Sequence, residues 1–579
     1  VCPAGVMSRE SLPVSQRIPI ELPRGEKGVV GPKGALLLFL AIFLSLLFPR
    51  FYALDQYVTY DEHLWLPLSA NFYRAVRTGQ FAETYQVGHP GVTTMWAASA
   101  GFLWRYPGYA EDVDAWTTHQ DIEEVLQTQG HSALELLSAG RVFVVLANAL
   151  LLALACLFAY RILGLWPTLV GFLFIAFDPF YIGQTRLLHV DGLASSFILL
   201  SLLAFIDYRQ HGQPASLVIS GVAFGLGCLT KSPAVFLLPV LAAIVPVDEM
   251  LNPRRAGSGS GRHRLLRAVA ILFIWSVIGG LVVVLAWPAM WVEPLQTVAK
   301  VSARAIGYAL QGHSLPLFFN GDRLNPGEMG IFSSFYPISL LWRASPLTLF
   351  GVAFSLLLLV RSRRLAVRKE LLRPLLLLLL FSLFFAFMVN LGSKKFVRYL
   401  LPIFPPLQLV AAIGWVTVAS WLGKRLSRWG SFLASVFLGV VVSLQLLLYL
   451  QVAPYPLAYY NPLLGGGQRA PEVNTIGWGE GLDQAARYLN QKLDAEQLTV
   501  LSWYPPAFSY YFEGTTMDMP AEGNLDEAQL AAADYAVIYL QQWQRNLPEP
   551  FLAMLVDQVP EQVIQINGIE YVRIYRLGD

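Results

Sequence analysis

The sequence predicts a polytopic α-helical membrane protein with large outer loops and a small C-terminal domain outside the membrane. Three observations predict this fold class. Of the 579 residues, 55% are hydrophobic and only 14% are charged. The mean hydropathy is +0.50, which is typical of a chain whose solvent is a bilayer. Finally, about eleven apolar stretches occur along the chain, each a candidate transmembrane helix.

The predicted spans are uneven in length. Several are shorter than the usual ~20 residues and need flanking residues to cross the bilayer. In chain order they are 35–54, 142–160, 166–181, 192–205, 217–230, 234–247, 269–287, 347–360, 375–389, 400–421 and 432–449.

Basic residues in the short loops predict the orientation of the chain. They precede the first span and fill the loops after the second, fourth, sixth, eighth and tenth spans. With eleven spans these loops share one side, so we expect a cytoplasmic N-terminus and an external C-terminus in the cell (inner or plasma) membrane. Since the formal net charge is only +2, nothing indicates a nucleic-acid partner.

This orientation predicts three parts and three large outer segments. The parts are a cytoplasmic tail at 1–33, a transmembrane domain at 34–450 and an extracytoplasmic domain at 451–579. The outer segments are 55–139, 288–346 and 451–579. In the last, a helical pattern at 481–493 and apolar or alternating runs at 498–503, 535–540 and 570–576 predict a small α/β or α+β fold.

The first outer segment begins with Tyr60-Asp61-Glu62-His63 directly after a span. Two adjacent carboxylates and a histidine at the membrane surface are candidates for a general base or a metal site. A merely solvated acidic pair is the alternative, which charge alone does not exclude. Apolar residues from 64 to 76 recur at helical spacing and predict an amphipathic helix on the membrane surface.

A second polar group, Arg186, His189 and Asp191, lies in the turn between the third and fourth predicted spans. Charged and imidazole groups beside lipid are costly unless they are paired or used. The group is therefore a candidate binding site, and a structural ion pair between Arg186 and Asp191 is the alternative.

Further cations stand on the predicted outer side, where the positive-inside bias disfavours them. Lys231 lies between the fifth and sixth spans, and Lys394, Lys395 and Arg398 cluster between the ninth and tenth. A lipid phosphate would compensate this charge through strong hydrogen bonds. Binding of lipid headgroups without chemistry is the alternative.

Aromatic residues accompany amides and acids in the second outer segment, where Tyr336 follows Phe335. Such residues suit stacking on a sugar or a peptide, although aromatic belts line every membrane surface.

Together these features resemble the lipid-phosphate-dependent glycosyltransferases of the C superfamily, in the branch of the protein O-mannosyltransferases and the aminoarabinose transferases of lipid A. The resemblance covers about residues 35–450. It is carried by the Asp61-Glu62 pair, His89-Pro90, the stretches 186–191 and 221–231, and the stretch 394–402 that ends Arg398-Tyr399-Leu400-Leu401-Pro402. Where family members often have His-Pro-Pro, this chain has Gly91 after Pro90.

The resemblance implies a role for each matching residue. Asp61 is expected to be the general base and Glu62 its partner, which orients the acceptor or serves as an auxiliary acid. The residues expected to hold the donor phosphate are Arg186, Lys231, Lys394, Lys395 and Arg398; those expected to contact acceptor or sugar are His89, His189, Asp191 and Tyr336. A divalent cation is left open, because some relatives bind one and others do not.

The predicted reaction is the inverting transfer of a sugar from a polyprenyl-phosphate lipid to a protein, lipid or glycan acceptor at the outer face. Membrane lipids are the other expected partners. Two alternatives remain: a transporter or flippase, which would need polar groups near the bilayer midplane, and a non-catalytic subunit of polysaccharide assembly, which would not need Asp61 and Glu62.

Overall fold

The computed structural model describes residues 31–251, 261–328, 330, 333–361, 369–426, 429–520 and 527–577. Most of the predicted cytoplasmic tail at 1–33 lies outside the described residues, as do many basic residues of the short loops.

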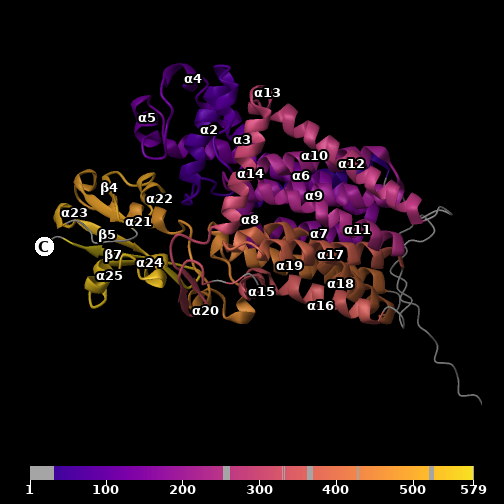
Figure 1. Cartoon of the computed structure of the whole chain (residues 1–579). Helices are drawn as coiled ribbons and strands as arrows, with labels where there is room; N and C mark the ends of the chain where they lie inside the picture. The colour runs from indigo at the N-terminus through magenta and orange to yellow at the C-terminus, as the bar shows by residue number, and fades with distance from the viewer. Residues whose placement is uncertain are drawn as a thin grey trace, which may run out of the picture.

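A helical bundle forms the larger part of the described chain (Figure 1). Seven helices are long and apolar enough to cross a membrane: α1 (Pro32–Phe51), α6 (Ala133–Leu163), α9 (Val190–His211), α12 (Gly261–Ala286), α17 (Lys369–Asn390), α18 (Phe404–Arg425) and α19 (Gly430–Leu450).

Further apolar helices are bent or short. Two pairs meet at angles of 66° and 114°: α7 (Leu165–Phe177) with α8 (Pro179–Thr185), and α15 (Phe335–Arg343) with α16 (Pro346–Arg361). The shorter ones are α10 (Pro214–Thr230) and α11 (Leu237–Leu251), the latter preceded by the 3₁₀-helix η2 (Ser232–Phe236); η3 (Val397–Ile403) leads into α18. Each of the eleven predicted spans overlaps these helices, although 166–181, 234–247 and 400–421 each cover two elements. Among the described residues the candidate spans number seven, or up to nine if each bent pair is one span, so the polytopic helical fold is confirmed.

The helices of the bundle differ in how much of their surface is buried inside the protein. The apolar window of α9 is 100% buried inside the protein, whereas that of α12 is only 17% buried. Leu265, Phe273 and Leu285 of α12 are exposed. An uncovered apolar helix surface of this kind faces lipid, so α9 forms the centre of the bundle and α12 its rim.

Small residues allow close helix packing in the bundle. A Cβ atom at Gly414 of α18 would lie only 2.1 Å from the carbonyl oxygen of Gly351 on α16. Such close approach of two backbones is a common means of helix association in lipid.

Replacing Gly414 by alanine should therefore lower the melting temperature of the detergent-solubilised protein. The new methyl group would force α16 and α18 apart, and overpacking of this kind costs about 1–3 kcal/mol. Gly439 on α19 is the matched control, since nothing lies within 4 Å of a Cβ there. Gly439→Ala should leave the melting temperature unchanged or raise it slightly, because alanine favours helix. Equal melting temperatures for the two variants would contradict this packing.

Short elements gather at one end of the bundle, which we call the loop end (Figure 1). From the first outer segment come α2 (Glu62–Arg77), η1 (Phe81–Thr84), α3 (Val92–Arg105), α4 (Tyr109–Asp112) and α5 (Ile122–Thr128). The second contributes α13 (Ala289–Val292), α14 (Pro294–Leu310), β1 (Leu317–Phe319) and β2 (Asp322–Leu324). The amphipathic helix predicted after Glu62 is present as α2. Most of its residues are buried within the protein.

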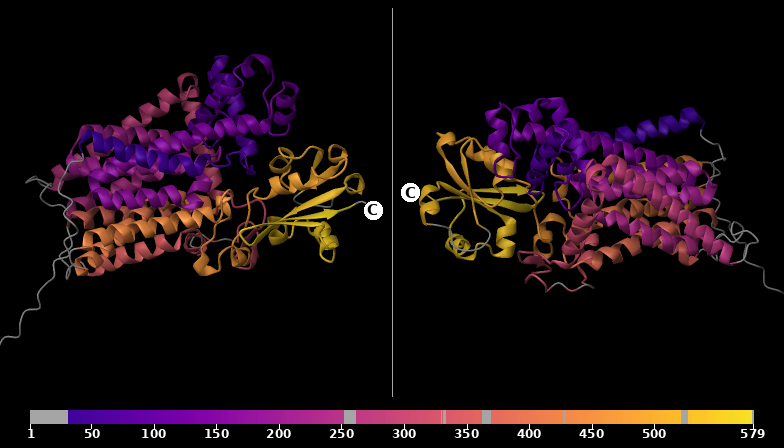
Figure 2. Two further views of the ribbon diagram at one scale, coloured as in Figure 1. Left: turned by 180° about the vertical axis from the view of Figure 1, so that it is seen from behind. Right: turned by 45° about the horizontal axis from the view of Figure 1, so that its top comes forward.

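The C-terminal domain is built on a five-stranded mixed sheet, with helices on both faces (Figure 2). Its strands, β3 (Thr499–Ser502), β4 (Thr515–Asp518), β5 (Tyr535–Tyr539), β6 (Gln562–Ile566) and β7 (Ile569–Arg576), are arranged in the order β4-β3-β5-β7-β6. β3 runs parallel to β4 and β5, while β7 is antiparallel to β5 and β6. β3, β5 and β7 coincide with the predicted runs, whereas β4 and β6 were not predicted.

Helices complete this domain and link it to α19. They are η5 (Pro456–Ala458), η6 (Pro462–Leu464), α20 (Gly466–Val473), α21 (Leu482–Leu489), η7 (Ala495–Gln497), α22 (Pro505–Ser509), α23 (Glu527–Ala532), α24 (Leu540–Arg545) and α25 (Glu549–Leu555).

The three long segments contact one another at the loop end. The amide of Gln56 donates to the carboxylate of Asp483 at 2.6 Å. The hydroxyl of Thr475 donates to the carbonyl of Phe318, also at 2.6 Å. The C-terminal domain is therefore docked on both other segments, and the space enclosed between them is where the candidate site lies.

Candidate functional site

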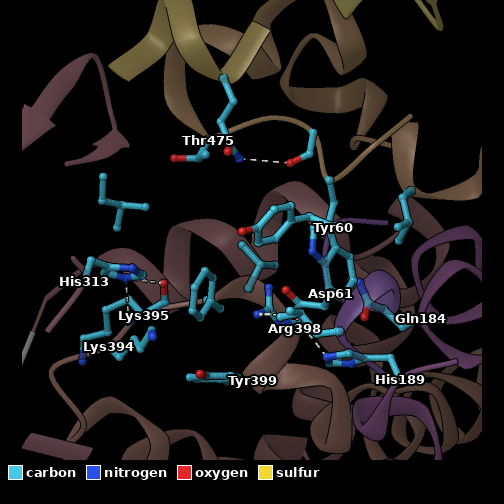
Figure 3. A pocket seen from close by; sticks show the side chains of 18 of the residues that line it. Tyr60, Asp61, Gln184, His189, His313, Lys394, Lys395, Arg398, Tyr399 and Thr475 are labelled. Carbon is cyan, nitrogen blue, oxygen red and sulfur yellow. Dashed lines mark hydrogen bonds and ion pairs between the residues drawn. The ribbon is translucent and has the colours of Figure 1, made fainter. Parts of the chain in front are cut away.

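A cavity of about 550 Å³ lies where the bundle meets the C-terminal domain (Figure 3). Its walls come from all three long segments and from the turns between the spans. Among the residues that line it are Tyr60, Asp61, Trp65, His89, Gln184, His189, Lys231, Tyr308, His313, Lys394, Lys395, Arg398, Tyr399, Asn474, Thr475, Trp478, Glu480, Trp503, Tyr504, Gln541 and Arg545. Seven of the eleven residues predicted as site residues are in this set: Asp61, His89, His189, Lys231, Lys394, Lys395 and Arg398.

The neighbouring carboxylates Asp61 and Glu62 face different surroundings. Glu62 is fully buried and accepts hydrogen bonds from the Arg141 guanidinium at 2.6 and 2.7 Å. It also accepts from the backbone N–H groups of Thr59, at 3.0 Å, and Leu188, at 2.8 Å. Asp61, by contrast, lines the cavity and its side chain is 22% exposed. Glu62 therefore fixes the turn that presents Asp61.

Asp61 belongs to a chain of alternating charges. The Arg398 guanidinium lies 3.1 Å and the His189 Nε2 3.2 Å from the same oxygen, Asp61 Oδ2. On the other side, His189 Nδ1 lies 3.1 Å from Asp191, which accepts from Lys231 Nζ at 2.5 Å. Figure 3 shows Asp61 between Arg398 and His189. The network holds the Asp61 carboxylate between the Arg398 guanidinium and the His189 imidazole, open to the cavity on one side.

The charges of this network determine the proton equilibria at its centre. Burial by itself raises the pKa of Asp61, but Arg398 and His189 outweigh it and hold the pKa well below its ordinary value. Burial lowers the pKa of His189, but its contacts with Asp191 and Asp61 more than compensate and raise the pKa. At neutral pH, Asp61 is therefore ionised.

Two lysines, Lys394 and Lys395, lie on the bundle side of the cavity. Lys395 Nζ donates to the backbone and side-chain oxygens of Asn390 at 2.5 and 3.0 Å, and lies 5.3 Å from the centroid of the Tyr336 ring. Lys394 Nζ lies 5.4 Å from the ring centroid of Tyr308. Burial lowers the pKa of Lys395 to about 8. Both ammonium groups are within the same wall as Arg398.

His89 lines the cavity and stacks on Tyr308, with 4.5 Å between the ring centroids. Burial, together with the charge of Lys231, lowers the pKa of His89 to about 3, so its ring is neutral. The turn after it requires glycine, because Gly91 has a φ of 61° and its N–H donates to the carbonyl of Thr230 at 3.1 Å. Proline could satisfy neither condition, which explains the departure from His-Pro-Pro.

Four predicted site residues do not line the cavity. Glu62 is occupied by Arg141, and Asp191 lies behind His189. Tyr336 is buried beneath Lys395. Arg186 is buried and donates to the carbonyl of Ala53. The ion pair between Arg186 and Asp191, considered as an alternative, is not formed in the described structure, because the partners of Asp191 are His189, Lys231 and Arg398.

The C-terminal domain supplies cavity residues that were not predicted from sequence, foremost Trp478. The Arg398 guanidinium lies 4.6 Å from the centroid of its ring, and the His189 ring 5.2 Å. The carbonyl of Trp478 accepts from the N–H of Tyr60 at 3.0 Å. The next residue, Gly479, has a φ of 133°, and a Cβ there would lie 2.1 Å from the carbonyl oxygen of Val58. The glycine-rich run around Trp478 is the local signal that could have indicated this close approach.

No group of three histidine, cysteine, aspartate or glutamate side chains is placed to hold a metal ion in the described part of the chain.

Comparison with known protein families gives a match over residues 133–283, to the family described as dolichyl-phosphate-mannose-protein mannosyltransferase. The matched segment contains His189, Asp191 and Lys231 of the charge network. This match confirms the resemblance to lipid-phosphate-dependent glycosyltransferases that the motifs indicated. No curated protein sequence matches the chain.

Several solved structures are similar to this chain. ArnT from Cupriavidus metallidurans bound to undecaprenyl phosphate is 15% identical, with 94% of this chain and 98% of that chain covered and a TM-score of 0.45. Archaeoglobus fulgidus AglB, in complex with an inhibitory peptide and a dolichol-phosphate, is 12% identical, with 88% and 70% covered and a TM-score of 0.47. The S. cerevisiae Pmt1-Pmt2 complex bound to the sugar donor is 10% identical, with 73% and 90% covered and a TM-score of 0.48. Identities this low assign neither a substrate nor a mechanism.

Replacing Glu62 by glutamine should destabilise the protein strongly, because Arg141 would remain buried without a counter-charge. Removing one partner of a buried ion pair costs about 3–5 kcal/mol. The exposed pair of Arg77 and Glu111, 2.9 Å apart, provides the control. Glu111→Gln should change stability little, since exposed pairs contribute about 0–1 kcal/mol. Thermal unfolding of both variants in detergent measures the difference, and a Glu62→Gln protein as stable as wild type would contradict a structural role for this pair.

Proposed function

We propose that this protein is a membrane glycosyltransferase that moves a sugar from a polyprenyl-phosphate lipid to an acceptor at the outer face of the membrane. The observation that carries the proposal is the cavity in which the carboxylate of Asp61 stands beside the cations Arg398, Lys394 and Lys395. A base and an anion-binding wall in one space are what transfer from a phosphate leaving group requires. The family match over residues 133–283 supports the same reaction class.

In the proposed reaction the acceptor hydroxyl or amine attacks the anomeric carbon from the face opposite the phosphate. The bond from that carbon to the phosphate oxygen breaks and the phosphate leaves with the electron pair, so the configuration inverts. Asp61 takes the proton of the acceptor. Arg398, Lys394 and Lys395 stabilise the negative charge that develops on the leaving phosphate.

The charge network couples donor binding to the strength of the base. Without donor, Arg398 contacts Asp61 at 3.1 Å and keeps this carboxylate a weak base. A donor phosphate that binds Arg398 competes for the same guanidinium and neutralises part of its charge. The pKa of Asp61 then rises toward the range in which a carboxylate accepts a proton well.

The position of the cavity favours this reaction over transport. Transporter sites lie near the middle of the membrane, between the halves of the protein. This cavity instead lies at the loop end, with the C-terminal domain as one of its walls. We place that end outside the cytoplasm, as the basic residues of the short loops indicate.

Asp61→Asn should abolish sugar transfer while the protein still binds donor lipid. Asparagine keeps the shape of the side chain but cannot take the proton, and a positioned base contributes about 10²–10⁴-fold to the rate. Transfer is measured with purified protein and a panel of radiolabelled polyprenyl-phosphate sugars. Asp55→Asn is the control, because Asp55 is an exposed carboxylate in the same segment. Near-normal turnover by Asp61→Asn would remove Asp61 from the catalytic role.

Donor binding should weaken as the pH rises through about 8, the value to which burial lowers the pKa of Lys395. Below this pH the Lys395 ammonium is charged and attracts the phosphate; above it the amine is neutral. Lys395→Arg should keep the charge and shift the loss of affinity to higher pH, because arginine stays protonated. Polyprenyl-phosphate binding measured from pH 6 to 10 tests this. An identical profile for both proteins would exclude Lys395 as the titrating group.

A further inference from the structure

Arg545 is a cation of the cavity for which the described structure provides no acidic partner. Arg545, the last residue of α24, lines the cavity, and its Nε is buried without a hydrogen-bond partner. Two cations on the bundle side, Lys231 and Arg398, are by contrast both paired with Asp191. A guanidinium whose Nε is buried without a partner is costly, and it remains charged at any physiological pH. Its counter-charge is therefore expected from outside the chain.

A second donor without a partner lies in the same wall. The side chain of Asn474 is 96% buried, it lines the cavity, and its Nδ2 has no hydrogen-bond partner among the described residues. Buried amide groups are almost always satisfied in proteins, so an unsatisfied one that faces a cavity indicates a missing acceptor.

The structure holds these two donors in a fixed relation. Gln544, next to Arg545, donates from Nε2 to the carbonyl of Asn474 at 2.8 Å and accepts from the N–H of Ile476 at 2.9 Å. The guanidinium of Arg323 donates to the carbonyl of Gln544 at 3.0 Å, which fixes the end of α24. These bonds tie the backbone at Asn474 to the end of α24, and two unsatisfied donors on tethered segments of one cavity suit the binding of an oxyanion.

We propose that Arg545 and Asn474 form an anion subsite that binds a phosphate or carboxylate group of the acceptor, distinct from the group that attacks the sugar. The proposal rests on the transferase function proposed above. Both donors belong to the segment after the last span, whereas Lys394, Lys395 and Arg398 lie between α17 and α18. A donor lipid anchored in the bilayer reaches the bundle wall, whereas an acceptor enters beside the C-terminal domain. The subsite thus restricts acceptors to those that carry an anionic group.

The test uses full-length protein saturated with polyprenyl phosphate, so that the donor subsite is already filled. Isothermal titration calorimetry then measures binding of phenyl phosphate, benzoate and the neutral analogue benzamide. We expect saturable binding of at least one anion and none of benzamide. The two anions separate a phosphate from a carboxylate ligand.

The variants assign this binding to the subsite. Arg545→Gln should weaken it about tenfold to a hundredfold, the usual contribution of a hydrogen bond to a charged group. Asn474→Ala should weaken it less, and Arg545→Lys should restore part of it. Arg573→Gln, at an exposed arginine of the same domain, should leave it unchanged. Size-exclusion chromatography and the Arg545→Lys protein separate loss of binding from loss of folding.

Three results would overturn the proposal: no saturable anion binding in the wild type, equal affinity in Arg545→Gln, or displacement of the anion when polyprenyl pyrophosphate replaces the monophosphate. The last result would assign Arg545 to the donor site. Failure to bind polyprenyl phosphate at all would instead contradict the proposed function. Anion binding can be measured without that lipid, so the two failures are distinguishable.

Discussion

The buried ion pair between Glu62 and Arg141 is the interaction on which the site depends. It ties the start of α2 to the centre of the bundle, and through the N–H of Leu188 it also holds the turn that carries His189. Asp61 and His189 are thus fixed by one carboxylate that is not itself in the cavity. Such a pair costs desolvation energy and contributes little net stability. The role of the pair is to position Asp61 and His189, which are oriented before any substrate arrives.

Opposite charges around Asp61 stabilise one another but also restrict its chemistry. Arg398 contacts both Asp61 and Asp191, and a phosphate must compete with these carboxylates to bind it. This competition makes the site self-regulating in the proposed mechanism: the base becomes strong only after the leaving group is in place.

Much of the fold could be predicted from the sequence, because the bilayer imposes a strong and local signal. Apolar stretches such as 192–205 identify α9 without knowledge of its neighbours. The cations Lys231 and Arg398 could be recognised because they oppose the expected charge bias. β4 escaped prediction since its four residues, Thr515–Asp518, include only one apolar side chain.

What could not be predicted depends on contacts distant in sequence. Asp61 and Glu62 are adjacent and chemically alike, and only the direction of α2 decides which faces the cavity. Arg186 resembled a phosphate ligand, yet its hydrogen-bond partner is the backbone carbonyl of Ala53, which no pattern of side chains reveals. Trp478 and Arg545 follow the last span, in a domain that the motifs did not cover.

The placement of Trp478 and Arg545 has a consequence for biosynthesis. Both residues follow α19 in the chain, so every span is synthesised before the part of the cavity wall that they form. The cavity is therefore complete only when the C-terminal domain has folded its sheet and placed Gly479 against the backbone of Val58. Under the proposed function, a nascent chain would therefore become active only after the C-terminal domain has been made and has docked on the bundle.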